Sequence, residues 1–462
     1  MKKKHLWATY VLFTSIPLFF FSCKKDPTSP IPGPQEPAKS ITSFASKATG
    51  EIYSQSVAVD KSGNTYVAGS LYGTGTFQTT VLSSAGNNDI FIAKYDSTGQ
   101  LLWAKIAGCT GQAAALDIAI DLSGNPYITG YFFGSITFGT TTMTTHDKGL
   151  AMYVAKYNAD GDVQWAKKAS GDGSISAEGI ALDKSGNIYI TGSFHTNATF
   201  GTITLTSTGY TVFIAKYTPS GALLWVKTTG DELASYGKDI AVDNKGTVYI
   251  TGIFKYSLTF GSTTLTSKGK EDVFIANFTT DGEFQWAKSA GNTEEDYGYS
   301  IALDGSSGVY IAGSFNKTIT FDNRTLTSNG WADMFLVKYT TSGQVQWAIS
   351  AGTDSQENAF AITTDLSGNV YATGYFYNTI SFGNEALTSN GSADIFVIKY
   401  NPTGNILWAK NAGGANMDHG KGIALDEDNN PYITGLFIQS ATFGDTILTS
   451  PNEGMYLWRI VP

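Results

Sequence analysis

Residues 180–194 read IALDKSGNIYITGSF and residues 213–227 read FIAKYTPSGALLWVK, and these two stretches decide the fold. The first is an apolar run that ends at Asp183, a turn that contains Gly186, and a second run built on Tyr189. An Asp that opens a turn and a Gly that accepts positive φ are typical of a β-hairpin with a short loop. The second stretch repeats this design, with a final run around Trp225. Together the two stretches predict four strands in succession.

The same phrases recur along the chain at a nearly constant spacing. The tryptophan of the last run stands at Trp103, Trp165, Trp225, Trp286, Trp347 and Trp408. The turn-opening aspartate stands at Asp60, Asp121, Asp183, Asp243, Asp304, Asp365 and Asp426. Between the second and third runs, a TFG…LTS segment predicts an extra hairpin or an extension of the strands. A long, fixed period marks a repeat architecture, and four strands per repeat indicate a β-propeller rather than a β-helix, which has shorter rungs.

The number of repeats predicts how the ring closes. The last FIAKY-like run is MYLWRI at residues 455–460, and no tryptophan run follows it. The chain therefore has one tryptophan run fewer than it has FIAKY-like runs. The missing member is at the other end, where SFASKATG (residues 43–50) places Phe44 in the tryptophan position. We therefore predict an all-β fold, a seven-bladed β-propeller over residues 40–462. Its ring is closed by an N-terminal strand that completes the last blade.

The recurrent D-x-S-G-N-x-Y-I-T-G, F-I-A-K-Y and G-x-x-x-W phrases resemble the bacterial seven-bladed propeller repeat family often called SBBP. The resemblance covers residues 40–462 and implies the propeller fold. It implies no activity, because the family has no agreed reaction. The G-x-x-x-W phrase is also similar to the tryptophan-docking motif of quinoprotein propellers, but no paired-cysteine quinone clamp accompanies it. No cofactor is expected.

Residues 1–22 resemble a bacterial lipoprotein signal, with three lysines, an apolar stretch and Ser22 before Cys23. Cys23 would then be lipidated, and the CKKD that begins there resembles the start of many Bacteroidota lipoproteins. Residues 23–39 are rich in proline and predict an extended tether. We expect an exported protein, anchored by lipid in the bacterial cell envelope, at the outer membrane. The alternative is an ordinary cleaved secretory signal with an incidental cysteine.

Charge and composition exclude several classes of function. Loss of the three signal lysines changes the formal charge from −9 to −12, which disfavours nucleic acid and anionic membrane surfaces as partners. We expect a monomer that meets the membrane only through its lipid. The histidines of the mature chain share no spacing, so neither a metal site nor a Ser-His-Asp triad is predicted.

Two repeated features have a structural interpretation beside a functional one. The turn at Asp426 (DEDNN) is the most calcium-like, whereas an aspartate that caps a hairpin turn needs no ion. Lysines recur in the FIAKY and LLWAK phrases, and we expect them to cover aromatic rings and protect sheet edges rather than form a binding stripe.

The segments that join each tryptophan run to the next repeat vary while the repeats around them stay constant. They span residues 51–56, 109–117, 172–178, 231–239, 292–300, 353–360 and 414–421, and contain thirteen acidic and two basic residues. The candidate binding residues in them are Tyr53, Asp172, Asp231, Glu232, Tyr236, Glu294, Glu295, Asp296, Tyr297, Asp354, Glu357, Asp418 and His419. Aromatic side chains beside carboxylates suit sugar rings, cationic peptides or basic protein surfaces.

These segments support two functional hypotheses. The first is a non-enzymatic envelope scaffold that binds a protein or a glycan through an acidic loop face. The second is a glycan hydrolase or lyase that takes its carboxylates from the same loops. No catalytic residue can be named, and a face whose charge serves only solubility is also compatible with the sequence.

Overall fold

The structure is a computed structural model that describes residues 43–145, 149–230 and 234–461. Within these residues the regular elements are all β-strands, so the predicted all-β class is confirmed. In this part of the chain no helix is long and apolar enough to span a membrane. The predicted signal peptide (residues 1–22), Cys23 and the tether (residues 23–39) lie outside the described residues.

The strands form successive antiparallel units of four, in which the sequence order is also the spatial order. The first four units are β1 (Phe44–Val59), β2 (Thr65–Phe77), β3 (Thr80–Tyr95) and β4 (Leu101–Cys109); β5 (Gln112–Ile120), β6 (Pro126–Phe133), β9 (Ala151–Tyr157) and β10 (Val163–Ser170); β11 (Ile175–Leu182), β12 (Ile188–Phe200), β13 (Ile203–Tyr217) and β14 (Leu223–Thr228); and β15 (Ala234–Val242), β16 (Val248–Lys255), β19 (Asp272–Phe278) and β20 (Phe284–Ala290). They are followed by β21 (Asp296–Leu303), β22 (Gly308–Phe315), β25 (Asp333–Thr340) and β26 (Val345–Ala351); β27 (Asn358–Thr364), β28 (Val370–Phe376), β31 (Asp394–Tyr400) and β32 (Ile406–Gly414); and β33 (His419–Leu425), β34 (Pro431–Phe443) and β35 (Thr446–Arg459), which pairs with the first part of β1.

The TFG…LTS segments take both of the predicted forms. Separate two-stranded hairpins are formed by β7 (Ser135–Phe138) and β8 (Thr141–Thr144), β17 (Ser257–Phe260) and β18 (Thr263–Thr266), β23 (Thr318–Phe321) and β24 (Arg324–Thr327), and β29 (Thr379–Phe382) and β30 (Glu385–Thr388). In the remaining units the same segment prolongs the ladders between β2 and β3, β12 and β13, and β34 and β35.

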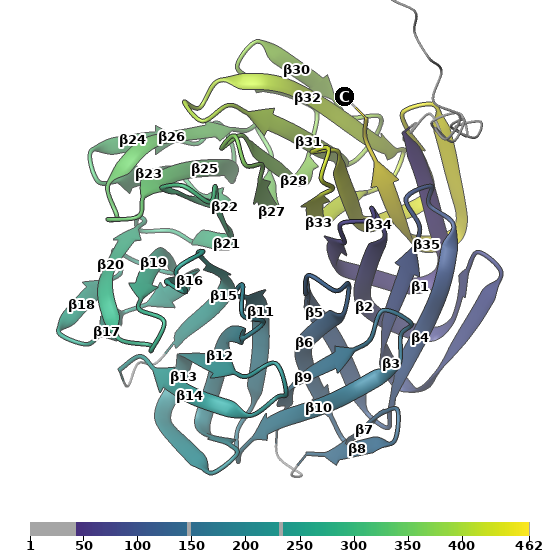
Figure 1. Cartoon of the computed structure of the whole chain (residues 1–462). Coiled ribbons are helices and arrows are strands. Elements are labelled where there is room, and N and C mark those ends of the chain that lie inside the picture. The colour runs from purple at the N-terminus through teal and green to yellow at the C-terminus, as the bar shows by residue number, and fades with distance from the viewer. Residues whose placement is uncertain (1–42, 146–148, 231–233, 462) are drawn as a thin grey trace, which may run out of the picture. The chain divides into compact units, whose positions relative to one another are not determined.

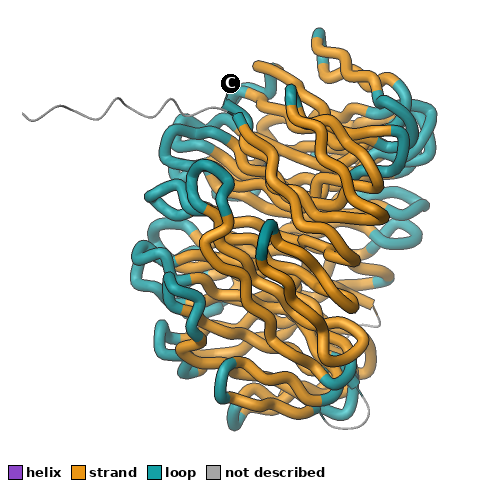
Figure 2. Tube along the Cα trace, turned by 90° about the vertical axis from the view of Figure 1, so that its right-hand side faces the viewer, coloured by secondary structure: helices purple, strands orange, loops and turns teal. Residues whose placement is uncertain are grey.

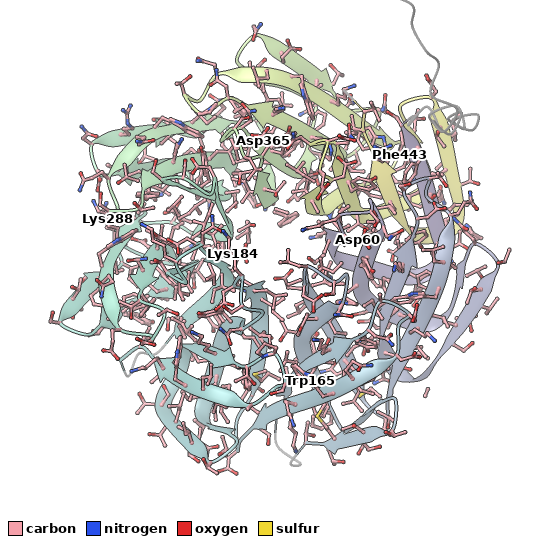
Figure 3. All side chains as sticks on the ribbon, in the orientation of Figure 1. Asp60, Trp165, Lys184, Lys288, Asp365 and Phe443 are labelled. Carbon is pink, nitrogen blue, oxygen red and sulfur yellow. The ribbon has the colours of Figure 1, made fainter. Side chains whose placement is uncertain are left out.

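The units are arranged in a propeller-like manner about one axis, with the first strand of each unit innermost and the last outermost (Figure 1). Figure 3 shows Asp60 and Lys184 close to this axis, whereas Lys288 lies further out. The strands run between two rims of loops (Figure 2). We call the rim with the turns after the first and third strands of each unit the turn face, and the opposite rim the loop face.

Burial explains why the strands lack a clean polar alternation. The middle strands β22 and β28 are buried along their whole length, whereas most residues of the outermost strand β26 are only partly buried. A sheet covered on both faces by its neighbours needs apolar residues on both faces. The apolar runs of the sequence are therefore the middle strands of the units.

Strand β1 links the two ends of the repeat region. Residues 51–59 pair with β2, whereas the ladder from Phe44↔Arg459 to Thr49↔Gly454 joins the start of β1 to β35. Phe44 packs edge-on against Tyr432 with the ring centres 6.2 Å apart, and tryptophan–tyrosine pairs of the other units, such as Tyr127–Trp165 and Tyr310–Trp347, have centroid distances of 6.1 and 5.9 Å. Phe44 thus contacts a tyrosine as the tryptophans do, and its strand pairs with the MYLWRI run.

The tryptophans hold neighbouring units together. Trp225 donates its indole N–H to the carbonyl of Thr280 in the next unit at 3.2 Å, and Trp347 donates to Pro402 at 3.0 Å. Gly282, at φ 76°, lies against the Trp225 ring, where a Cβ atom would be 3.2 Å from ring carbons. The glycine of the G-x-x-x-W phrase therefore packs against the tryptophan of the preceding unit.

Candidate functional site

Each innermost strand carries a β-bulge at the same register. The pairing shifts between Ser54 and Ser56 in β1 and between Gly237 and Asp239 in β15, and the corresponding shift occurs in β5, β11, β21, β27 and β33. A bulge inserts one residue that has no partner on the next strand and interrupts the alternation of side chains. The bulge residue and the residue after it can then face the axis together.

The bulges line a cavity of about 260 Å³, which we call the axial cavity. The bulge residues in its wall are Gln55, Leu116, Glu178, Lys238, Tyr299, Phe360 and Lys421. The residues that follow them and also line it are Ser56, Asp117, Asp239, Ser300, Ala361 and Gly422. No two units contribute the same pair of residues, although the strands around them repeat. The axial cavity is therefore the place where the repeat units differ most.

Asp117 uses its carboxylate to bind the backbone that the bulges leave unpaired. One oxygen accepts hydrogen bonds from the Ser56 hydroxyl at 2.7 Å and from the Ile118 N–H at 2.8 Å. The other accepts the N–H of Ile180, in the following unit, at 2.8 Å. Burial raises the pKa of Asp117 in spite of these three donors. This carboxylate joins three consecutive innermost strands.

Asp239 performs the same task further round the axis. It accepts hydrogen bonds from its neighbour Ile240 N–H at 2.7 Å, and from the Ser300 hydroxyl and the Ile301 N–H at 2.8 Å each. Burial raises its pKa, and the charge of Asp117 raises it further. The two aspartates therefore share the cavity as an electrostatically linked pair that holds protons more tightly than exposed carboxylates do.

An arc of aromatic side chains borders the other side of the axial cavity. Tyr297 and Tyr299 are stacked with centroids 5.7 Å apart, and Tyr299 meets Phe360 edge-on at 5.2 Å. Phe360 packs against Tyr375 at 5.6 Å, and Tyr375 stacks on His419 at 4.5 Å. We call these five side chains the aromatic arc. Tyr299 and Phe360 line the axial cavity and remain partly exposed, so their rings are accessible from it.

A cation lies within this apolar wall. The Lys421 ammonium is 3.6 Å from the centroid of the Phe360 ring, a favourable cation–π arrangement. Burial lowers the pKa of Lys421 to about 8. Burial, together with the charge of Lys421, lowers the pKa of His419 to about 4, so the imidazole is neutral at physiological pH.

A second cation, Lys238, is shared between an acid and a ring. Its ammonium is 3.8 Å from a carboxylate oxygen of Glu178 and 5.9 Å from the centroid of Tyr236. All three side chains are partly exposed, and Lys238 and Glu178 line the axial cavity. The cavity therefore offers rings, cations and hydrogen-bond acceptors to one ligand.

The four predicted aromatic residues of the loop face are brought to equivalent positions. Tyr53, Tyr236, Tyr297 and His419 each stand two residues before the bulge residue of their innermost strand. All four are partly exposed. Tyr53 donates a hydrogen bond to Glu453 of β35 and packs edge-on against Tyr72. The innermost strands thus carry these residues to the loop-face side of the axial cavity.

Three predicted acids are buried and do not form part of the exposed face. The side chains of Asp296, Glu357 and Asp418 are 0% exposed. Asp418 accepts the N–H of Gly414 at 2.7 Å and of Ile438 at 2.9 Å, and equivalent bonds hold Asp296 and Glu357. Burial raises the pKa of Asp296 to about 8 and that of Asp418 to about 7. The prediction that these three acids belong to an exposed binding face is corrected: they organise the connections between units.

Other predicted acids are paired with groups of the loop face itself. Glu294 and Glu295 lie 3.4 and 3.1 Å from the Lys270 ammonium, and Glu294 also contacts Lys317. The lysines come from the connections between second and third strands, which the sequence interpretation did not count. The loop face is therefore less acidic than the predicted segments indicate.

The remaining predicted acids lie apart from the axial cavity or outside the described residues. Exposed Asp172 accepts a hydrogen bond from the Asn197 amide at 2.7 Å. Exposed Asp354 accepts one from Asn378 at 2.8 Å. Neither residue lines the cavity. Asp231 and Glu232 lie outside the described residues.

The repeated aspartate and lysine of the turn face have the structural roles that were expected. Asp365 accepts the N–H groups of Ser367 and Asn369 at 3.0 and 2.9 Å, which closes the turn. The Lys399 ammonium lies 3.6 Å from this carboxylate and 4.6 Å from the centroid of Tyr371. At Asp426 the cation is the Arg459 guanidinium, 3.0 Å away. The lysines therefore cover aromatic rings, as predicted.

Sequence reasoning missed most of the axial cavity because it placed the strand boundaries too late. The segments predicted as connections include the beginnings of the innermost strands, which start at Ala234 in β15 and at Asn358 in β27. Phe360 and Lys421 were thus assigned to loops instead of the cavity wall. One pattern could have revealed this wall: Asp239, Ser300 and Ala361 are spaced at the repeat period and share one register, and the bulge residues directly precede them.

Comparison with known proteins agrees with the repeat. A family model described as SBBP, a beta-propeller repeat, matches residues 164–197. An uncharacterized WD repeat-containing protein of Acanthamoeba polyphaga mimivirus is 23% identical over 442 residues, covering 78% of this chain and 32% of that protein. The regulatory protein FlaEY of Caulobacter vibrioides is 25% identical over 143 residues, covering 29% of this chain and 15% of that protein. The Neurospora crassa Pan2 WD40 domain has a TM-score of 0.46 and 7% identity, with 88% of each chain covered.

The chain therefore spans less than two thirds of the length of both relatives. The repeat match and the all-β units together define a β-propeller repeat protein.

Proposed function

We propose that this protein is a non-enzymatic binding scaffold of the bacterial cell envelope, built as a seven-bladed propeller and anchored through Cys23. The proposed ring consists of the four-stranded units, with the ladder between β1 and β35 joining its ends. The signal-like N-terminus and the proline-rich segment after Cys23 support export and anchoring. A propeller on a tether would present its faces to partners at a distance from the membrane.

The observation that carries the proposal is the axial cavity. Selection for folding alone would allow the units to remain alike at this register, as they are at the turn face. Instead the bulge residues include Gln55, Glu178, Lys238, Tyr299 and Phe360. Divergent residues on a constant scaffold are typical of a binding site. We therefore place the ligand site at the loop-face end of the axis.

The chemistry of the cavity favours a glycan over a cationic peptide. The partly exposed rings of the aromatic arc offer flat faces for sugar rings, and the aspartates and lysines beside them offer hydrogen-bond partners for hydroxyl groups. Two lysines, Lys238 and Lys421, face the same space, and they would repel a cationic peptide. A protein partner remains the other outcome of the test.

The test is direct binding by the full-length protein extracted from envelope in mild detergent. Glycan fragments of the native envelope are screened first, and hits are titrated by calorimetry. Tyr299→Ala and Phe360→Ala should each weaken binding at least about tenfold, as expected for a stacking platform of about 1.4 kcal/mol or more. The matched control is Leu366→Ala, which is 95% exposed on the turn face. Unchanged affinity in both cavity variants would reject the site.

The enzymatic alternative rests on the raised pKa values of Asp117 and Asp239 in one cavity. A glycan hydrolase needs two carboxyl groups, one of which keeps its proton at neutral pH. Against it, both carboxylates already bind the backbone N–H groups of innermost strands. Asp117→Asn and Asp239→Asn decide between the hypotheses: lower stability with retained glycan binding supports the scaffold, whereas intact folding with lost glycan turnover supports the enzyme.

The proposed anchor has its own test. Cys23→Ala should release the protein from the membrane fraction and abolish the incorporation of labelled fatty acid. A variant that remains in the membrane fraction without label would show that another segment provides the attachment.

A further inference from the structure

The turn face carries a cation at the same position in nearly every unit, and this cation lies between neighbouring units. The third strands place Lys94, Lys156, Lys216, Lys338 and Lys399 over a tyrosine, with ammonium-to-centroid distances of 4.6 to 4.9 Å. Lys216 and Lys338 also donate to a backbone carbonyl of the next unit, Thr280 or Pro402, at 3.0 and 3.3 Å. The ammonium therefore has three kinds of partner: a ring, a carboxylate of the turn and a carbonyl of the next unit.

One unit lacks this cation. At the equivalent position of β19 stands Asn277, opposite Tyr249 of β16. The Asn277 amide donates to the carbonyl of Val248 at 3.2 Å, and its short side chain is only 4% exposed. Asn277 lines a cavity of about 470 Å³, which we call the Asn277 pocket; the equivalent cavity beside Lys156 is smaller, about 360 Å³. The Asn277 pocket lies on the turn face, between the unit of β15–β20 and the unit of β21–β26.

The partners of the missing ammonium are still present around the Asn277 pocket. Its lining includes Asp243, Tyr249 and Thr341, the equivalents of the turn carboxylate, the ring and the carbonyl-bearing residue of the next unit. The Thr341 carbonyl accepts only the indole N–H of Trp286, at 3.1 Å, among the described residues. The equivalent Thr280 carbonyl accepts both Trp225 at 3.2 Å and Lys216 at 3.0 Å. Thr341 can therefore accept a second donor.

Asp243 has also lost its side-chain donors. Its Oδ1 atom accepts the N–H groups of Lys245 and Thr247 at 2.8 Å each, as in the other turns. Its Oδ2 atom accepts no hydrogen bond from the described part of the chain. In the equivalent turn of Asp365, Oδ2 accepts the amide of Asn369 at 2.7 Å and the hydroxyl of Tyr371 at 3.3 Å. Thr247 replaces that asparagine, so one oxygen of Asp243 is available to a cation.

We propose that the Asn277 pocket binds a primary ammonium group. The group would lie over the Tyr249 ring, between Asp243 and the Thr341 carbonyl, in the place that Lys94, Lys156, Lys216, Lys338 and Lys399 occupy in their units. A carboxylate oxygen, a ring and a carbonyl that can accept a second donor make a site that is charged, aromatic and directional at once. The cavity is large enough for an alkyl stem as well as the ammonium. A free alkylamine and a lysine side chain of a partner present the same chemistry.

The first experiment uses matched probes on the full-length protein. Butylammonium should raise the melting temperature and bind with a measurable calorimetric signal, whereas 1-butanol, which has the same stem and no charge, should bind at least about tenfold more weakly. Nα-acetyl-lysine methylamide and its Nε-acetylated form then test the lysine source. Binding of butylammonium without binding of Nα-acetyl-lysine methylamide indicates a small-molecule ligand. Tighter binding of Nα-acetyl-lysine methylamide indicates a lysine side chain of a partner protein.

Two variants make the result specific to the pocket. Asn277→Lys restores the residue that the other units tolerate, and should abolish butylammonium binding while the protein stays folded. Asp243→Asn keeps a side-chain oxygen for the turn but removes the charge, and should weaken binding at least about tenfold. Equal responses to butylammonium in the wild type and Asn277→Lys would overturn the proposal, as would equal binding of butanol. Because the Asn277 pocket is on the turn face, a negative result there does not bear on ligand binding at the axial cavity.

Discussion

The two ends of the innermost strands behave differently, and the difference separates scaffold from site. At the turn-face end, the same aspartate, tyrosine and cation recur in nearly every unit, with nearly the same distances. At the bulges, the backbone irregularity recurs but the side chains do not. A repeated side chain performs a task that every unit needs. A repeated bulge with changing side chains provides a constant frame for a variable surface.

The test with the largest expected effect removes the strand segment that joins β1 to β35. Deletion of residues 43–49 would take away the ladder between β1 and β35 and the Phe44–Tyr432 contact. Both ends of the strands should then lose order, with a loss comparable to the whole free energy of unfolding of a domain, about 5–15 kcal/mol. Circular dichroism melting measures the change, and deletion of residues 26–32 is the control. An unaltered melting temperature would contradict the proposed closure.

The second test removes one tryptophan of the scaffold. Trp347→Ala leaves a cavity between two units and takes one hydrogen-bond donor from the Pro402 carbonyl, and should cost about 3–5 kcal/mol. Urea unfolding measures it. The matched control is Trp331→Ala, at a side chain that is 82% exposed, and its effect should stay within about 0.5 kcal/mol. Similar losses in both variants would mean that the docked position has no special role.

The third test compares two units at the turn-face end. Lys338 and Asp304 form a pair 3.5 Å apart with side chains 8% and 4% exposed. Lys338→Met leaves a buried carboxylate without its cation and should cost about 3 kcal/mol. Asn277→Met, at the equivalent position, breaks no ion pair and should cost about 1 kcal/mol, the value of its hydrogen bond to Val248. Equal losses in urea unfolding would show that the cation contributes nothing.

The sequence predicted the scaffold better than it predicted the site, and the reason is physical. Phe44 was recognisable because the docking position demands an aromatic ring in each unit, so its spacing was enough. Phe360 and Lys421 carry no such constraint, and the bulge that turns them toward the axis has no residue signature. Asp296 was misassigned because a charged residue in a variable segment was taken as exposed. Its burial depends on N–H donors from Asn292 and Asn316, which lie before β21 and after β22 and meet only in the folded chain.

The fourth test concerns the pH dependence that such buried acids impose. Burial raises the pKa of Asp296 to about 8, whereas an unfolded aspartate titrates near pH ~4. The folded protein therefore holds a proton that the unfolded chain has lost between these values. The stabilisation by this proton is complete below about pH 4 and disappears as the pH rises through about 8.

Asp296→Asn should remove this contribution, so that its stability falls less between about pH 5 and pH 6.5 than that of the wild type, by about 2 kcal/mol. Urea unfolding at the two pH values measures the difference. Asp354→Asn, at an exposed and hydrogen-bonded aspartate of a neighbouring connection, is the control. Parallel pH profiles of the wild type and Asp296→Asn would show that Asp296 is ionised in the folded protein.

The smallest expected effect comes from the two residues that precede Asp296. Glu294 and Glu295 contact Lys270 on the loop face, where the lysine is half exposed. Exposed ion pairs contribute little, so Glu294→Gln with Glu295→Gln should change stability by less than about 0.5 kcal/mol. Three consecutive acids would then divide between surface and frame: replacing the first two alters only the charge of the loop face, while replacing the third alters the pH dependence of folding. If the double variant changes the pH dependence of stability as Asp296→Asn does, the connection acts as one structural unit, and the loop face cannot vary independently of its frame.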